Sequence, residues 1–407
     1  MRSSNAAKPN LHVLLAPSAY PTRSHPVKGT FVQQQAAAVR RSGVKVGVIY
    51  PDFRSIRDLR VWALPDNHFQ IGFAQEYGIP IYRFCGWNIP RLRLEPFLWR
   101  LEAKRLFKRY LKQYGKPDLI HAHNVLWGGV AAMAIAEETD IPFMVTEHAS
   151  SFARGLIRSW QAPFLRQVMN KADCLLAVSA KLAEQMQPYG EGKKVSVLPN
   201  AVDTEFFVPP SVQRNDRPFR VLTVALLTPV KGIDVLLRAF AQAFSHHENV
   251  VLEVGGDGKQ KKYLQQLAKD LNIENQVQFL GLLSRAQVRD AMWRANIFVL
   301  PSYVETFGVV LIEAMATGLP VIAARCGGPE DIIEPGVGWL VSPGDAEQLA
   351  VALTNAYASY RKIKSEEPYI RNYTVNHFSG GMIAGALLKH YHDILEKKAP
   401  DIIEIKR

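Results

Sequence analysis

The chain alternates short apolar runs with longer amphipathic runs. The first half contains the apolar runs LHVLLAP (residues 11–17) and VKVGVIYP (44–51) on either side of FVQQQAAAVRRSG (31–43), which has helical spacing and ends at a glycine. Strands that alternate with helices of about 10 to 15 residues are typical of β-α-β units and a parallel sheet. Nearly continuous apolar strands fit a sheet covered on both faces. The pattern predicts an α/β fold.

Residues 200–219 interrupt this pattern. NAVDTEFFVPPSVQRNDRPF contains three prolines and no apolar period, so we interpret it as a linker between domains. The alternation then restarts at RVLTVAL (220–226). The prediction is two doubly wound Rossmann-like domains that face each other across a cleft. Their predicted bounds are 1–205 for the N-terminal domain, 206–378 for the C-terminal domain, and 379–407 for a last helix that can return to the N-terminal domain.

Composition limits the compartment and the partners. The net charge of +12 and the pI of about 9.5 fit an anionic partner (nucleic acid, a membrane surface or a phosphate-bearing ligand) and fit simple solubility charge equally well. The three cysteines are far apart and form no C-x-x-C, which indicates a reducing compartment. No run is long enough for a signal-peptide core or a membrane span. We expect a cytoplasmic protein, either free or held at the inner face of the cell membrane.

The loop after the first apolar run, APSAYPTRSHPVKGTFVQQQ, places Gly29 directly before a helix. A glycine there lets free helix amides approach an anion such as a phosphate. The loop is not G-x-G-x-x-G, so dinucleotide binding is not supported. The alternative is a glycine that a turn requires.

Two further polar segments follow apolar runs, where ligands of parallel sheets bind. Glu147 and His148 follow the run 142–146, and His148 can donate to a substrate oxygen or transfer a proton. The alternative is a histidine that satisfies a local carbonyl. HAHN (121–124) has a similar position, but for it the structural interpretation is stronger.

Lys231 precedes Gly232 at the start of a predicted helix in LLTPVKGIDVLL. A lysine beside free helix amides suits a phosphate. The segment is not a G-x-x-x-x-G-K-[ST] loop, which excludes P-loop chemistry.

Two carboxylates lie in the otherwise apolar stretch PSYVETFGVVLIEAMATGLPVIA, residues 301–323. Glu305 lies at the mouth of a helix and Glu313 lies inside it. A buried carboxylate must accept hydrogen bonds, and vicinal hydroxyls are suitable donors. The alternative, two surface glutamates, requires an exposed helix. The pattern predicts a site for a phosphate between two hydroxyl-bearing groups, which describes a nucleotide sugar, with helix amides contributed near Phe307, Gly308 and Val309.

Together these segments resemble family 4 of the retaining glycosyltransferases, which have the GT-B fold. The resemblance rests on the E-x7-E pair Glu305 and Glu313, on VKGID (230–234) and on LPNAVDTEFF (198–207). YPTRSHPVKGTFVQQQ and TEHASSF also match. It covers nearly the whole chain.

The resemblance implies a role for each matching residue. Glu305 would hold hydroxyls of the donor sugar, and Glu313 would accept from the ribose. Lys231 would neutralise the leaving diphosphate, which the amides near Phe307 and Gly308, together with Gly29, would also bind. His148 would contact the donor sugar near the reacting carbon. The family needs no metal, and the chain has no Asp-x-Asp. The expected donor is a UDP-sugar or a GDP-sugar, and the sequence does not choose the base.

One position departs from the family. Relatives usually have an arginine a few residues before the lysine, and here Leu226 takes its place. Either another cation replaces this arginine, for which Arg325 is a candidate, or the protein binds the donor more weakly, or it has lost activity.

Residues 94–114 have the spacing of a basic amphipathic helix. Such a helix can bind an anionic membrane, or it can pack on the sheet with a solvated basic face. The predicted apolar face comprises Phe97, Leu98, Leu101, Phe107, Tyr110, Leu111 and Tyr114. The predicted basic face comprises Arg100, Lys104, Arg105, Lys108, Arg109 and Lys112.

The sequence thus predicts a metal-independent retaining glycosyltransferase (a hexosyltransferase type) of cell-surface polysaccharide or glycolipid biosynthesis, with a carbohydrate or lipid-linked acceptor. A nucleotide-sugar epimerase, a glycosyl phosphorylase and a non-catalytic nucleotide-sugar-binding protein are the alternatives. No recognised nucleic-acid motif supports a nucleic-acid partner.

Overall fold

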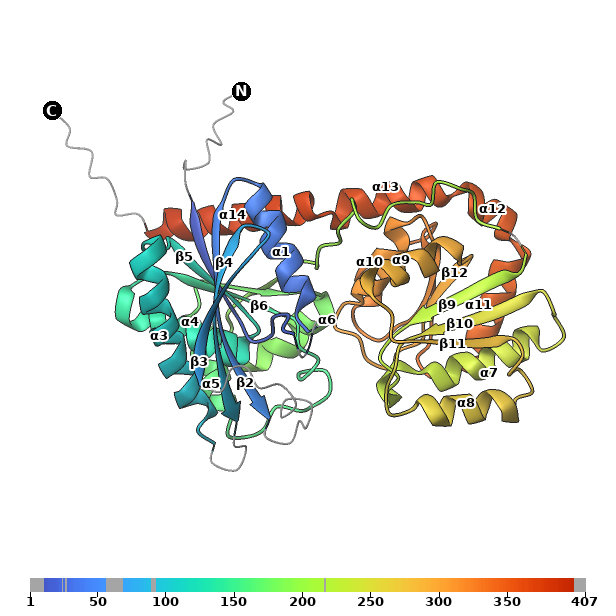
Figure 1. The fold of residues 1–407 in the computed structure, drawn as a ribbon, viewed down its shortest axis with the longest axis horizontal. Coiled ribbons are helices and arrows are strands. Elements are labelled where there is room, and N and C mark those ends of the chain that lie inside the picture. Colours follow the sequence, from blue (N-terminus) through green and yellow to red (C-terminus); the bar gives the residue numbers. More distant parts are fainter. Residues whose placement is uncertain are drawn as a thin grey trace, which may run out of the picture. The chain divides into compact units, whose positions relative to one another are not determined.

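The computed structural model describes residues 11–23, 25, 28–55, 69–88, 93–215 and 217–398. The chain divides into two compact units (Figure 1). The first comprises Met1–Val178, Ala183–Leu198 and Ile383–Arg407, and the second comprises Ser179–Leu182 and Pro199–Met382. The main division therefore lies between Leu198 and Pro199, slightly before the predicted boundary.

The first unit is built on a sheet with the strand order β3-β4-β2-β1-β5-β6-β7-β8. Every neighbouring pair is parallel except β3 and β4. The strands are β1 (His12–Pro17), β2 (Lys45–Ser55), β3 (Gln70–Glu76), β4 (Ile79–Asn88), β5 (Leu119–His123), β6 (Phe143–Glu147), β7 (Cys174–Ala177) and β8 (Val195–Val197). The helices and helical turns up to Leu198 are α1 (Thr30–Arg41), α3 (Glu95–Tyr114), η2 (Val125–Gly129), α4 (Val130–Thr139), α5 (Ala162–Lys171), α6 (Ala180–Met186) and η3 (Gln187–Tyr189).

The β3–β4 hairpin was not predicted. Its two turn residues, Tyr77 and Gly78, both have positive φ, 52° and 71°. Two consecutive positive φ values are typical of a type I′ turn, which usually has Asn or Asp followed by Gly. Tyrosine at the first position weakens that sequence signal, and β3 has no continuous apolar run that would mark a strand.

The second unit is built on an all-parallel sheet with the order β11-β10-β9-β12-β13-β14. Figure 1 shows α7 and α8 on one side of it and α9 and α10 on the other. The strands are β9 (Phe219–Val224), β10 (Val250–Gly255), β11 (Val277–Gly281), β12 (Ile297–Leu300), β13 (Val321–Ala324) and β14 (Gly338–Val341). The helices and turns are η4 (Pro229–Lys231), α7 (Ile233–Phe244), α8 (Lys261–Asp270), α9 (Arg285–Arg294), α10 (Val309–Ala316), η5 (Pro329–Asp331), α11 (Ala346–Ala358), α12 (Tyr360–Ser365) and α13 (Glu367–Phe378).

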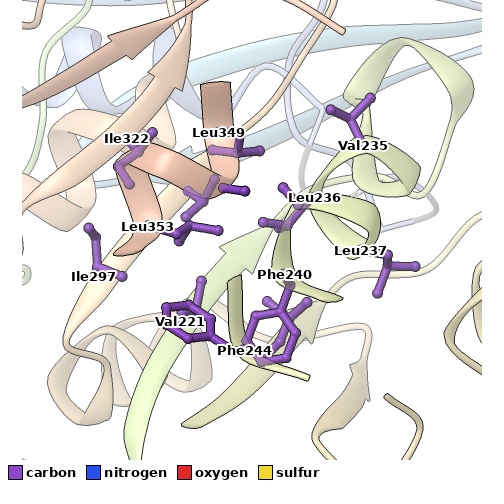
Figure 2. Packing of buried hydrophobic residues seen from close by; sticks show 14 of the residues in the cluster. Val221, Val235, Leu236, Leu237, Phe240, Phe244, Ile297, Ile322, Leu349 and Leu353 are labelled. Atoms are coloured by element: carbon purple, nitrogen blue, oxygen red, sulfur yellow. The ribbon is translucent and has the colours of Figure 1, made fainter. Parts of the chain in front are cut away.

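The core of the second unit fixes the strands that precede the candidate site. Val221 of β9 and Ile297 of β12 are buried together with Phe240 of α7 and Leu353 of α11 (Figure 2). Each such side chain contributes about 1.5–3 kcal/mol when it leaves water. This packing holds β9 and β12 side by side, and the loops that follow them begin from fixed points.

The segment 200–219 is packed against the second unit, so its interpretation as a linker is wrong for most of its length. Val202 pairs with Ser379, and its N–H donates to the carbonyl of Phe378 at 2.8 Å. Arg214 is buried, donates to the carbonyl of Thr317 at 2.7 Å and pairs with Glu367 at 2.6 Å. The prolines and polar residues of this segment leave it without a hydrophobic periodicity. A segment without secondary structure can nevertheless be buried when its polar groups form hydrogen bonds.

The last helix, α14 (Gly380–Lys398), begins in the second unit and belongs to the first unit from Ile383 onward. Tyr391 is fully buried there, and its hydroxyl lies 2.8 Å from Nδ1 of His121 on β5. The helix therefore packs on the sheet of the first unit, as the sequence allowed.

Helix α3 buries only part of the predicted apolar face. Phe107 and Tyr110 are buried as predicted, and Trp99 and Leu106 are buried as well, whereas Phe97 is 64% exposed. The remaining large apolar side chains on the exposed side are Leu101 and Leu111. The helix thus packs on the unit through one apolar stripe and keeps other apolar side chains in solvent. Within the part of the chain that the structure describes, no helix is long and apolar enough to cross a membrane.

Candidate functional site

The order of the second sheet creates a site at the ends of β9 and β12. These strands are neighbours, but β9 is followed by β10 on one side and β12 by β13 on the other. Ligands of open α/β sheets bind where the connections diverge in this way, beyond the carboxyl ends of the strands. Lys231 lies on the loop after β9, and Glu305 lies on the loop after β12.

Lys231 and Glu305 are brought together, 74 positions apart in the sequence. The ammonium Nζ of Lys231 donates to Oε1 of Glu305, and the buried hydroxyl of Ser302 donates to the same oxygen at 3.0 Å. Both charged side chains keep part of their surface accessible. The pair is therefore fixed in direction and still open to a ligand.

A close backbone contact places Lys231. Gly232 has φ 63°, and a Cβ there would lie 2.1 Å from the carbonyl oxygen of Pro301. Any larger residue would push the two loops apart. The N–H of Tyr303 also donates to the carbonyl of Val230 at 2.8 Å. These contacts tie the loop after β9 to the loop after β12.

The backbone of Glu305 is anchored to the segment after β13. Glu305 forms a parallel bridge with Gly327, and its carbonyl accepts from the N–H of Gly328 at 3.0 Å. The position of Glu305 is therefore fixed by its backbone contacts, and the orientation of its carboxylate is fixed by Lys231 and Ser302.

The amino end of α10 follows this pair directly. Gly308 caps the helix with φ 100°, and no side chain caps it. Among the described residues, no backbone partner takes the N–H groups of Gly308 and Val309. The side chain of Phe307 is buried and lies 6.0 Å from the ring of Phe378, so only its backbone can serve a ligand. Free amides and the helix dipole favour an anion here.

Glu313 lies one turn into α10. Its side chain is partly buried, and this burial raises its pKa to about 7. Across the described ranges, no hydrogen bond or ion pair reaches this carboxylate. A carboxylate with unmet acceptor capacity suits hydroxyl donors.

The sequence did not indicate Arg285, at the start of α9. Its charge lowers the pKa of Glu313, against the larger effect of burial. Arg285 pairs with Asp203 at 3.2 Å, and its guanidinium lies 4.3 Å from the ring centre of Phe206. The segment VDTEFF therefore holds a cation near Glu313. Arg285 and Glu313 are far apart in the sequence, so the sequence did not indicate that the charge of Arg285 acts on Glu313.

Neither position weighed for a second diphosphate cation supplies a charge to this arrangement. Leu226 is 58% exposed and supplies no charge. Arg325 lines a hollow with Glu334 and Trp339 at the edge strand β14, and no donor residue predicted from the sequence lines it. In the residues covered by the structure, Lys231 is the basic side chain that contacts Glu305.

Gly29 and His148 belong to the first unit. Gly29 caps α1 with φ 74°, and a Cβ there would lie 2.3 Å from the carbonyl oxygen of Ala19. The turn therefore requires glycine, and the same backbone leaves the amino end of α1 without a side-chain cap. Phe31 of α1 contacts His148, with ring centres 4.5 Å apart.

His148 follows β6 and is buried. Its backbone N–H donates to Oε1 of Glu147 at 2.8 Å and to Oδ1 of Asn124 at 3.0 Å. Glu147 also accepts from the N–H groups of Val125 and Ala149, at 2.8 and 2.6 Å. Burial raises the pKa of Glu147 to about 7, and these backbone bonds oppose the rise. Glu147 therefore fixes the backbone around His148 and is not itself available to a substrate.

The structure also connects His148 with HAHN. Nδ1 of His123 lies 3.1 Å from Nε2 of His148. Across the described ranges, no group of three or more His, Cys, Asp or Glu side chains has the arrangement of a metal site.

Comparison with known proteins agrees with these features. The family model for Glycosyltransferase Family 4 matches residues 29–206, and that for Glycosyl transferases group 1 matches residues 206–373. Together they span both units. The chain belongs to the glycosyltransferases of this type. Its two units are those of the GT-B fold.

Similar proteins cover most of this glycosyltransferase. TuaC of Bacillus subtilis (strain 168), provisionally named as a teichuronic acid biosynthesis glycosyltransferase, is 28% identical over 84% of the chain and 88% of its own length. The structure of sucrose-phosphate synthase from Thermosynechococcus elongatus matches with TM-score 0.74 at 21% identity, over 95% of this chain and 99% of that one. That of Anabaena HepE in complex with UDP matches with TM-score 0.70 at 21% identity, over 94% and 100%.

The raised pKa of Glu313 predicts a pH-dependent stability. An acid whose pKa is higher in the folded state than in the unfolded state destabilises the fold as it ionises, here as pH rises from about 4.5 to above 7. Glu313→Gln, which cannot ionise, should therefore melt about 2–4 °C higher than the wild type at pH 8.5 and equally at pH 4.5. Thermal unfolding without ligand across this range measures the difference. Glu248→Gln, at an exposed position, is the control, and a Glu313→Gln effect that does not change with pH would contradict the assignment.

Proposed function

We propose that this glycosyltransferase moves a sugar from a nucleoside-diphosphate sugar to an acceptor hydroxyl, with retention of configuration and without a metal ion. The observation that carries the proposal is the Lys231–Glu305 pair at the uncapped amino end of α10. It places a cation, free amides and a carboxylate within one loop region, which suits a diphosphate joined to a sugar.

The diphosphate would bind to the helix end. The ammonium of Lys231 and the amides of Gly308 and Val309 are all donors, and they meet where the α10 dipole is positive. A negative charge that grows on the leaving phosphate would be stabilised by these fixed groups. The positive charge that a metal would otherwise supply is thus provided by the chain.

The two carboxylates would bind the two polyols of the donor. Glu305 is already oriented by Lys231 and Ser302, so its second oxygen can accept from sugar hydroxyls. Glu313 has no protein partner in the described residues and can accept from the ribose. Glu305 precedes α10 and Glu313 lies inside it, so the diphosphate would lie between them at the amino end of the helix.

The reaction would proceed on one face of the sugar. The bond between the anomeric carbon and the diphosphate oxygen breaks, and the acceptor oxygen forms its bond to the same face of that carbon. The acceptor proton moves to the departing phosphate oxygen, which Lys231 and the α10 amides stabilise. Glu305 is engaged with Lys231 and is not assigned as a nucleophile.

The relatives suggest which substrates to test first. HepE was solved with UDP, so UDP-sugars come before GDP-sugars. TuaC is named for teichuronic acid biosynthesis, and we propose a cell-surface polysaccharide or a lipid-linked glycan as the acceptor class.

Substitutions at the ion pair should reduce transfer. With EDTA present, Lys231→Met should lower kcat about 100- to 1,000-fold, because it removes a charge that stabilises the leaving group. Glu305→Gln should lower kcat/KM about 10- to 100-fold, because a charged hydrogen-bond acceptor is lost. The measurement is release of nucleoside diphosphate with acceptor present, and Lys269→Met on the exposed end of α8 is the control.

Three results would overturn parts of this proposal. Full activity of Glu305→Gln would remove its role, and activity that EDTA abolishes would remove metal independence. Conversion of the donor without any acceptor would favour the epimerase, and nucleotide binding without turnover would favour a non-catalytic binding protein.

Leu226 allows the opposite experiment, a gain of function. If the missing arginine weakens diphosphate binding, Leu226→Arg should lower the Kd for the nucleoside diphosphate about tenfold, the value of one charge-assisted hydrogen bond. Calorimetric titration measures this change. Leu282→Arg, at another exposed leucine of the second unit, controls for non-specific charge, and equal effects of both variants would contradict the role of position 226.

We further propose that the first unit contacts an anionic membrane through α3. The first unit contains 31 Lys and Arg against 18 Asp and Glu, whereas the second contains 18 against 19. The net charge of the protein thus resides in the first unit. A charge confined to one unit fits a localised anionic partner better than general solubility.

The outer face of α3 combines charge with apolar side chains. Three of its predicted basic residues are paired with carboxylates: Arg100 with Glu137 and Lys104 with Glu138, each at 2.6 Å, and Arg105 with Glu102 at 2.7 Å. Its other basic side chains, Lys108, Arg109 and Lys112, are exposed, as are the apolar Phe97, Leu101 and Leu111. Basic groups near the headgroups and apolar groups that insert between them are typical of a helix that lies on an anionic bilayer.

Vesicle binding tests this surface. The triple variant Lys108→Glu, Arg109→Glu, Lys112→Glu should bind phosphatidylglycerol-containing vesicles at least about tenfold more weakly, because each basic group contributes about 1 kcal/mol near such a surface. The control reverses three exposed lysines of the second unit, Lys259, Lys262 and Lys269. Co-sedimentation at low and high salt measures binding. Equal loss in both triple variants, or no salt-sensitive binding by the wild type, would remove the membrane contact.

A further inference from the structure

Two histidines of HAHN lie on one face of β5. His121 and His123 are two positions apart on the strand, so their side chains point the same way. Both are fully buried, and their rings stack with centres 4.4 Å apart and an interplanar angle of 29°. Nothing in the proposed reaction uses this pair, although it lies next to His148.

His121 is held from two sides. Its Nδ1 lies 2.8 Å from the hydroxyl of Tyr391 on α14, and its Nε2 lies 2.8 Å from the hydroxyl of Thr146 on β6. Both ring nitrogens therefore have partners, and the ring plane is fixed. Because His123 stacks on this ring, its orientation is fixed as well.

His123 has one partner and one unsatisfied nitrogen. Its Nδ1 lies 3.1 Å from Nε2 of His148, whereas its Nε2 has no hydrogen-bond partner within the described part of the chain. Burial holds the pKa of His123 well below its usual value, with smaller effects from His121 and His148. The ring is therefore neutral and has a single proton to place.

The position of that proton follows from the free-energy cost of a buried N–H group that has no hydrogen-bond acceptor. A proton on Nε2 would leave a buried N–H without an acceptor, which is rare in proteins. A proton on Nδ1 leaves only an unused lone pair on Nε2 and forms a hydrogen bond to His148. In that arrangement His123 donates and Nε2 of His148 accepts.

We infer that His123 is a positioning residue that fixes His148 as a neutral imidazole with its proton on Nδ1. A proton on Nε2 of His148 would face the N–H of His123, so both the other tautomer and the imidazolium are disfavoured. His148 then accepts at Nε2 and cannot act as an acid through that nitrogen. The tautomer rests on the geometry alone, and its effect on sugar transfer rests on the proposed function.

Nitrogen NMR of the histidine side chains in the full chain tests the inference without any substrate. The 15N shifts of a ring distinguish the protonated nitrogen from the unprotonated one. In the wild type, His148 should carry its proton on Nδ1. His123→Leu removes the donor and should shift the tautomer ratio of His148 about fivefold toward Nε2–H, the value of one hydrogen bond. His123→Asn can place an amide N–H near the former Nδ1 and should preserve the wild-type tautomer.

The wild-type spectrum alone can overturn the inference, because a His148 proton on Nε2 would contradict it even if His123→Leu did not fold. An unchanged tautomer in a folded His123→Leu variant would overturn it as well.

Kinetics separate positioning from packing. With a UDP-sugar that raises the Tm of the protein, His123→Leu should lower kcat about tenfold with KM unchanged, and His123→Asn should restore most of kcat. Equal losses in both variants would assign His123 to packing alone. If no nucleotide sugar binds, the proposed function fails, and the tautomer of His148 still decides the inference about His123.

Discussion

The site of the second unit depends on two parallel strands that end side by side. Because β9 and β12 are neighbours and their connections diverge, the loops that follow them meet, and Lys231 reaches Glu305. The close approach of Gly232 to Pro301 removes the space that a side chain would need. The core beneath these strands therefore sets the position of the ion pair as firmly as the paired residues do.

Two carboxylates, one buried and one partly buried, show how burial can serve either structure or ligand. Burial raises the pKa of Glu147 and that of Glu313 to about 7. Glu147 accepts three backbone N–H groups and holds the backbone around His148. Glu313 has no such donors in the described residues. The cost of removing the Glu147 carboxylate from water is offset by hydrogen bonds within the protein. For Glu313, hydroxyl groups of a ligand would offset this cost.

Sequence periodicity was most informative where one element buries one face. It located α1, α7, α10 and the central strands, because their apolar spacing follows directly from contact with a sheet. It failed for the β3–β4 hairpin, whose Tyr77–Gly78 turn lacks the usual residues, and for residues 200–219, which are buried without a period. It also misassigned part of the buried face of α3, because Phe97 and Trp99 are both apolar and only the neighbouring elements decide that Trp99 is covered and Phe97 is not.

The sequence by itself determined the two α/β units, the placement of Lys231, Glu305 and His148 after apolar strands, and the family, since each depends on local spacing and residue type. The tertiary structure alone decided which of these groups touch. The contact of Lys231 with Glu305, the charge of Arg285 near Glu313 and the bond between His123 and His148 join residues that lie on different elements. Hydrogen bonds and ion pairs form over about 3 Å, and only the packed sheets bring such distant residues within that range.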